Sequence, residues 1–152
     1  DLTQRLDSPV DGAFTQEKIN EIVLWKVNRY APLSADSLAA LNSTKSIAAG
    51  SHREADTCIR QLLKQPGVDL PMASTLLRFR NPEVFQIIDR HAYRALYGDD
   101  YPLYTKSGES RKVDLYFKYL DDLSVLCTRS GINFKDSDRI LYIFDKQENG
   151  AL

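Results

Sequence analysis

Two short stretches of the chain carry residue types that could bind phosphate and perform chemistry. Residues 66–68 (Pro-Gly-Val) lie between two segments with helical spacing, and residues 89–91 (Asp-Arg-His) follow an apolar run. A glycine-containing turn between helices can point backbone N–H groups outward, and with the positive end of the next helix these groups bind a phosphate oxygen. Such a contact holds a nucleic-acid backbone without reading its sequence. Asp89, directly before a helix, is either a functional carboxylate or an ordinary N-cap, for which aspartate is among the best residues.

The order and spacing of these stretches resemble the helix-hairpin-helix DNA glycosylase superfamily, the endonuclease III-like base-excision enzymes (HhH-GPD). The family signature is LPGVGxKTA, then an apolar helix, then VDTHVxR. Residues 66–68 match the turn, Ala73 matches the small residue of the second helix, and residues 88–91 (Ile-Asp-Arg-His) match the VDTH element. Pro71 holds the lysine position of the family, eighteen residues before Asp89, a spacing typical of many members. The close match spans residues 62–96.

The resemblance implies a compact, DNA-glycosylase-like helical bundle in a single domain over residues 1–152. The helix-hairpin-helix would cover about residues 54–79, and the segment of the catalytic aspartate about residues 86–97. By this resemblance Asp89 is the catalytic carboxylate, which would stabilise the positive charge that builds on the sugar as an N-glycosidic bond breaks. It would also guide the attacking water. The target base must leave the stack for this chemistry.

The same resemblance implies a DNA-binding surface and a base pocket. The surface residues would be Pro66, Gly67, Val68, Asp69, Leu70, Arg90, Arg94 and Asn28. Asn28 would fill the gap left by the flipped base, and Trp25 or Tyr30 would line the base pocket by stacking. The alternative is that Trp25 and Tyr30 are partly buried and that Asn28 is an ordinary surface residue. His91 fits a structural hydrogen-bonding residue better than a general base.

Three departures from the family pattern limit the expected chemistry. Pro71 replaces the lysine whose amine forms a Schiff base with the sugar, so we expect hydrolysis that leaves an abasic site, without a lyase step. Asp69 replaces the second glycine of the turn, and its negative charge would oppose a nearby phosphate. The four-cysteine iron–sulfur motif is absent, so no cofactor or metal is expected. Cys58 and Cys127 lack metal-ligand spacing and fit small buried hydrophobic residues.

Helical periodicity predicts the elements that would position these residues. The predicted helices run from the N-cap Thr15 to a stop at Pro32, from Ser34 to Leu41, from Glu54 to Lys64, from near Pro71 to Asn81, from Asp89 to Gly98, from the end of a 98–110 loop to Ser130-Gly131, and from Asp136 onward. In the last helix we expect Ile140, Leu141 and Phe144 to face the core. No run of strict alternation is long enough for a sheet, so the predicted fold class is all-α.

Composition sets limits on partners and location. The net charge of −1 argues mildly against nucleic-acid binding, because proteins that bind phosphate are usually basic. A local excess of positive charge can still favour phosphate binding, since positions 78–94 contain four arginines and only two acidic residues. No stretch reaches the roughly 18 apolar residues of a membrane span, and no signal-peptide pattern opens the chain. We therefore expect a cytoplasmic protein that binds no membrane, and the resemblance implies duplex DNA as its partner.

Two other interpretations stay open at this point. A non-catalytic DNA-binding module that kept the scaffold predicts salt-dependent DNA affinity without any product. A protein-interaction domain, with a partner that the sequence does not identify, is favoured by the net charge and by Asp69. It predicts that the chain fails to bind DNA even at about 50 mM salt, where electrostatic binding is strong.

Overall fold

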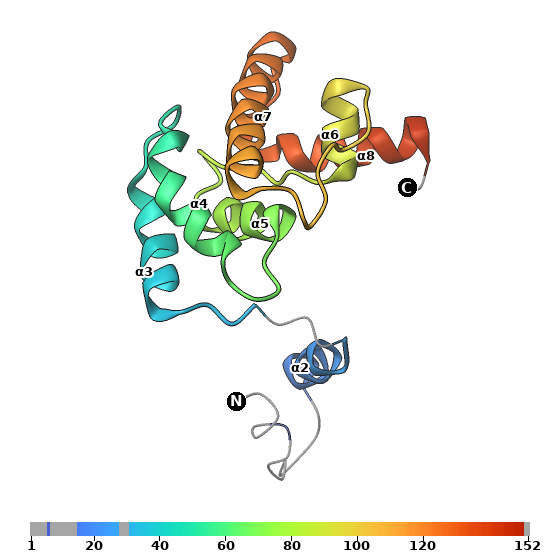
Figure 1. Ribbon diagram of the computed structural model, residues 1–152. Coiled ribbons are helices and arrows are strands. Elements are labelled where there is room, and N and C mark those ends of the chain that lie inside the picture. The colour runs from blue at the N-terminus through green and yellow to red at the C-terminus, as the bar shows by residue number, and fades with distance from the viewer. Residues whose placement is uncertain (1–5, 7–14, 28–30, 151–152) are drawn as a thin grey trace. The chain divides into compact units, whose positions relative to one another are not determined.

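The structure is a computed structural model that describes residue 6, residues 15–27 and residues 31–150 (Figure 1). These parts are helical and contain no strand, so the predicted all-α class is confirmed. Contacts divide the chain into two compact units, residues 1–32 and residues 33–152. The first unit contains α2 (Gln16–Val27) and the second contains every element from α3 onward. A single functional domain over residues 1–152 stays a prediction.

In the first unit, α2 begins where the sequence predicts a helix start. Thr15 Oγ1 accepts a hydrogen bond from the Lys18 N–H at 3.2 Å, which satisfies one of the backbone donors that a first helical turn leaves open. Thr15 is therefore the N-cap, as predicted. Trp25 lies on this helix and is 45% exposed. Asn28 and Tyr30, for which the sequence predicts roles in DNA and base binding, lie outside the described residues.

The second unit is a compact group of helices whose ends follow local chemistry. Its elements are α3 (Ala35–Ser43), the 3-10 turns η1 (Thr44–Ser46) and η2 (His52–Ala55), α4 (Asp56–Leu63), α5 (Leu70–Arg80), α6 (Arg90–Tyr97), α7 (Glu109–Ser130), the 3-10 turn η3 (Phe134–Asp136) and α8 (Ser137–Asn149). Ser34, Asp69 and Asp89 cap α3, α5 and α6 through side-chain oxygens. Gly98 and Gly131 follow the last residues of α6 and α7, as predicted.

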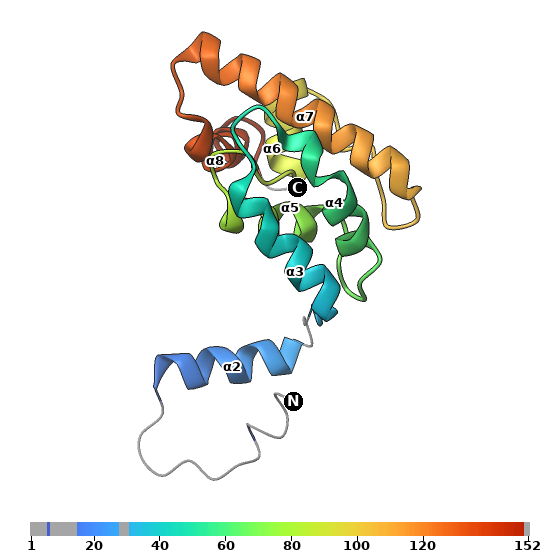
Figure 2. The ribbon, with the colours of Figure 1, turned by 90° about the vertical axis from the view of Figure 1, so that its left-hand side faces the viewer.

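The core of this unit forms around α7, which packs against α4 (Figure 2). The apolar side chains that follow helical spacing along α7 are buried: Val113, Tyr116, Phe117, Leu120, Leu123 and Cys127. The hydroxyls of Tyr116 and Tyr119 donate to the backbone oxygens of Gln86 and Ile87, at 3.0 and 2.9 Å. Because these bonds satisfy backbone groups that would otherwise be buried without partners, they fix the segment that leads to Asp89.

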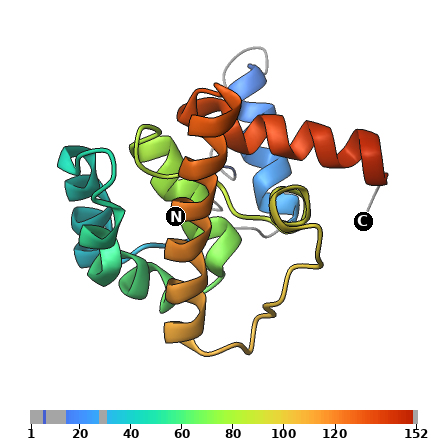
Figure 3. The ribbon, with the colours of Figure 1, turned by 90° about the horizontal axis from the view of Figure 1, so that it is seen from above.

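The orientation of α8 differs from the prediction. Figure 3 shows α8 running across α6, which is seen end-on, and these two helices form the most extensive helix pair of the unit. Leu141 faces the core as expected, but Ile140 and Phe144 are 42% and 50% exposed, so their predicted burial is wrong. The buried positions beside Leu141 are instead acidic, Asp138 and Asp145. Ion pairs to α5 and α6, described below, decide which face of α8 turns inward.

Asn81 should carry much of the stability of the junction that follows α5. Its side-chain amide is buried and donates to Thr44 O at 2.9 Å and to Ile47 O at 3.0 Å. Asn81→Ala leaves buried carbonyls without donors, so we expect the free energy of unfolding to fall by roughly 2 kcal/mol. Urea denaturation followed by circular dichroism measures this. Asn42→Ala, on the exposed face of α3, is the matched control and should stay within about 0.5 kcal/mol of the unmodified chain.

Candidate active site

The turn between α4 and α5 is built around Gly67. Its φ is 76°, in the left-handed region that glycine adopts readily and that strains other residues. The Val68 N–H donates to Gln65 O at 3.1 Å, and the side chains of Val68 and Leu70 are buried. Pro66 and Gly67 are exposed. Of the predicted hairpin residues, Pro66 and Gly67 therefore face solvent, while Val68 and Leu70 anchor the turn in the core.

Asp69 is both the N-cap of α5 and the partner of a buried lysine. Its Oδ1 accepts the Leu70 N–H at 2.7 Å and lies 2.7 Å from Lys112 Nζ, which comes from α7. The Lys112 side chain is buried, so this pair is partly removed from water and attracts more strongly than a surface pair would. The negative charge that would oppose a phosphate at the turn is therefore compensated within the protein.

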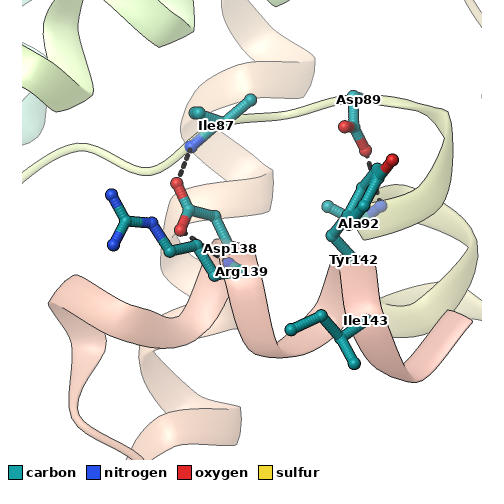
Figure 4. Close-up of a pocket in the computed structure, with 7 residues that line it drawn as sticks. All are labelled: Ile87, Asp89, Ala92, Asp138, Arg139, Tyr142 and Ile143. Atoms are coloured by element: carbon teal, nitrogen blue, oxygen red, sulfur yellow. Dashed lines mark hydrogen bonds between the residues drawn. The ribbon is translucent and has the colours of Figure 1, made fainter.

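Asp89 is the N-cap of α6, and it also lines a pocket between α6 and α8 (Figure 4). Asp89 Oδ1 accepts the Ala92 N–H at 2.7 Å, which fixes the side chain and leaves Oδ2 for other partners. The cavity, hereafter the Asp89 pocket, has a volume of about 350 Å³ and mostly apolar walls. Its lining residues are Ile87, Asp89, Ala92, Asp138, Arg139, Tyr142 and Ile143. This volume lies within the range of small-molecule sites.

The part of α8 in forming one wall of this pocket was not predicted from the sequence. Asp138 Oδ2 accepts the Ile87 N–H at 3.3 Å and lies 3.4 Å from Arg78 Nε, so α8 is joined to the segment before Asp89. One sequence signal was available. Asp138 and Asp145 are seven residues apart and lie on the face of α8 that carries Leu141, and buried acidic residues require partners.

Asp145 joins α8 to α6 through a buried ion-pair network. Its carboxylate accepts two hydrogen bonds from Arg94, from Nε and Nη2, both at 2.8 Å. His91 Nδ1 lies 2.6 Å from Oδ2, and the Asn149 amide donates to Oδ1 at 3.0 Å. The Arg94 guanidinium, and to a lesser degree His91, hold the pKa of Asp145 well below its usual range. The Arg94 guanidinium is therefore bound to Asp145 within the protein. His91 has the structural role that the sequence favours.

Arg90 is placed differently from Arg94. It occupies the first position of α6, it is exposed, and it forms no ion pair within residues 31–150. Tyr101 lies near both capping aspartates: burial raises the pKa of its hydroxyl, and the carboxylates of Asp69 and Asp89 raise it further. Tyr101 therefore keeps its proton at neutral pH. Of the two arginines predicted to contact DNA, Arg90 is the one with an available guanidinium.

Comparisons of the chain with protein-family models, with curated proteins and with solved structures gave no match. Among the described residues, no three His, Cys, Asp or Glu side chains are arranged to hold a metal ion. None of the helices in the described ranges is long and apolar enough to cross a membrane. Trp25 lies in the first unit, and the Asp89 pocket is formed by the second. The glycosylase resemblance thus depends on residues 62–96 alone.

The Asp145 network predicts a specific pH dependence of stability. The pKa of Asp145 is lower in the folded chain than in the unfolded chain, where an aspartate titrates near about 3.9. Its contribution is therefore present above that value and is lost as pH falls through the folded pKa. Asp145→Asn should lower the free energy of unfolding by roughly 3 kcal/mol at neutral pH, because Arg94 loses its buried partner. The difference between the two proteins should shrink below about pH 4.

Urea denaturation at a series of pH values measures this difference. Asp114→Asn is the matched control, since Asp114 is exposed on α7 and should contribute within about 0.5 kcal/mol. A loss of stability with Asp145→Asn that does not change with pH would show that the carboxylate's charge is not what joins α6 to α8.

Proposed function

We propose that the chain is a monofunctional DNA glycosylase-like protein that hydrolyses the N-glycosidic bond of a modified base, with Asp89 as its catalytic carboxylate. The observation that carries this proposal is the position of Asp89. Its carboxylate is half-buried on the wall of a pocket of about 350 Å³, with one oxygen fixed by the Ala92 N–H. A carboxylate fixed in this way can stabilise positive charge on a sugar without first having to reorganise.

The pocket supports the proposal through its size and its walls. A base that leaves the stack needs a cavity with apolar or aromatic surfaces. Tyr142 and Ile143 supply such surfaces from α8, and Ile87 supplies another from the segment before Asp89. The resemblance located only the carboxylate, whereas these walls come from a helix about fifty residues further along the chain.

The reaction is a hydrolysis in which the C–N bond between sugar and base breaks. The bonding electron pair leaves with the base, and positive charge develops on the sugar ring beside the Asp89 carboxylate. Asp89 Oδ2 orients a water whose oxygen adds to the anomeric carbon, and the proton that the water loses reaches the departing base. Pro71 offers no amine at the start of α5, so no Schiff base forms and the product is an abasic site.

The turn at residues 66–67 supports backbone binding. Its exposed tip is followed by the N-terminus of α5, and helix N-termini favour phosphate. Lys112 compensates the charge of Asp69 at the same place, and Arg90 offers an available guanidinium nearby. These contacts would hold DNA without reading its sequence, so specificity would come from the pocket.

A second candidate, a non-catalytic DNA-binding module, is favoured by the capping role of Asp89. The 2.7 Å hydrogen bond from the Ala92 N–H makes Asp89 the N-cap of α6, a structural role that requires no catalytic activity. In that case the chain binds DNA and releases no base. Side-by-side measurements of DNA binding and abasic-site formation separate the two candidates.

Asp89→Asn is the decisive variant, because asparagine caps a helix as well as aspartate does but carries no charge. We expect folding to be preserved and base release from duplexes with modified bases to fall at least about 100-fold. Abasic sites are measured by strand cleavage in alkali. Asp36→Asn, in the exposed first turn of α3, is the matched control and should release base at the unmodified rate.

Two results would contradict the proposal. One is a failure of the unmodified protein to release any base from a broad panel of modified duplexes. The other is base release by Asp89→Asn at the rate of the Asp36→Asn control, which would leave Asp89 with its capping role alone.

A further inference from the structure

A groove lies beside the turn, and its lining includes Tyr101, Leu103 and Tyr104, for which the sequence predicts no role. It consists of two adjoining hollows of about 270 and 180 Å³, which share Arg90, Tyr101, Leu103 and Tyr104 as lining residues. Asp69 and Pro71, from the start of α5, line the second hollow. This groove, hereafter the Tyr104 groove, shares no lining residue with the Asp89 pocket. It joins the N-terminal ends of α5 and α6 to the loop before α7.

The loop that forms one side of this groove is held in place at several points. Leu103 is buried, and Lys112 Nζ donates to Thr105 O at 2.9 Å. The Tyr104 N–H donates to Ser107 Oγ at 3.1 Å, and the Ser107 N–H donates back to Tyr104 O at 2.8 Å. These contacts place the backbone of Tyr104 in a closed turn with both polar groups satisfied.

The side chain of Tyr104 is exposed to solvent and is not packed in the core. It is 72% exposed, the highest value among the exposed large hydrophobic residues of the described chain. Tyr101, one wall of the groove, is in contrast fixed by an edge-on contact with Tyr93, at 5.6 Å between ring centroids. An aromatic ring on a rigid turn loses little conformational freedom when a planar group stacks on it.

The charges around the groove favour a phosphate-bearing ligand. Arg90 is exposed and forms no ion pair within residues 31–150, so its guanidinium is available. Lys112 compensates Asp69 at 2.7 Å, which removes most of one opposing charge. Asp100 lines only the first hollow and is exposed to solvent, which screens it.

We propose that the Tyr104 groove binds a nucleotide of DNA whose base lies outside the base-pair stack. Tyr104 stacks on the base, and Arg90 binds the phosphate. An aromatic face beside a guanidinium is the combination by which proteins hold unpaired nucleotides without sequence preference. This inference rests on the DNA binding in the proposed function, and it adds a second site that does not use the Asp89 carboxylate.

Binding to a short single-stranded oligonucleotide that carries the fluorescent base 2-aminopurine tests this site. The same oligonucleotide annealed to its complement is the paired reference. Tyr104→Ala should weaken binding of the single strand by about tenfold and change duplex binding much less, because only an unpaired base offers its face. Tyr104→Phe should bind as the unmodified protein does, since the ring stacks without its hydroxyl. Arg90→Ala should reduce the salt dependence of binding by about one phosphate contact.

Phe79→Ala is the matched control, because Phe79 is an exposed aromatic residue on α5 that does not line the groove. It should leave single-strand binding unchanged. Single-strand binding by Tyr104→Ala as tight as that of the unmodified protein overturns the inference. An equal loss with Phe79→Ala overturns it too, as does an unmodified protein that does not bind the single strand at about 50 mM salt.

The same preparations separate this inference from the proposed function. Base release from modified duplexes reports on Asp89, and 2-aminopurine quenching reports on Tyr104. Normal base release together with unchanged single-strand binding by Tyr104→Ala would overturn the groove and leave the enzyme. Stacking that depends on Tyr104, without any base release, would keep the groove and overturn the enzyme.

Discussion

The buried carboxylate of Asp145 is the constraint on which the candidate site depends. It receives both hydrogen bonds of the Arg94 fork and a contact from His91, so it joins α8 to α6 at a fixed position. That position places Tyr142 and Ile143 in the wall of the pocket that Asp89 also lines. A buried charge is tolerated only when its partners replace the water that it loses. The pocket therefore depends on the ion pairs that Asp145 forms with Arg94 and His91. His91 and Arg94 are near Asp89 in sequence, but none of these three residues has a part in the proposed chemistry.

This constraint also explains why sequence reasoning misplaced part of α8. Ile140, Leu141 and Phe144 have the spacing of a core-facing stripe, and apolar burial is the usual guide to orientation. In α8, two acidic residues instead determine which face turns inward, because Asp138 and Asp145 form ion pairs with arginines on α5 and α6. These partners are more than fifty residues away in sequence. The apolar pattern within a single helix does not predict ion pairs with residues that are so distant in sequence.

Features set by neighbouring residues were predictable. Thr15 and Asp89 cap the helices that the sequence places after them, and Gly98 ends α6 as expected. Capping is decided within three or four residues, so local chemistry is sufficient. The pairing of Asp69 with Lys112 was not predictable, because it joins residues from different helices. It reverses the expected effect of Asp69, from an uncompensated charge that opposes phosphate to one half of an ion pair.

The capping role of Asp89 and its proposed catalytic role are compatible because they use different oxygens. Oδ1 accepts the Ala92 N–H, and the bond fixes the direction in which Oδ2 points. A free carboxylate on a loop would have to be oriented in each turnover, at a cost in entropy that a preorganised group avoids. The cap therefore supplies the rigidity that a lone carboxylate needs when Pro71 leaves it without a lysine neighbour. The feature that makes Asp89 look merely structural is the one that would let it act alone.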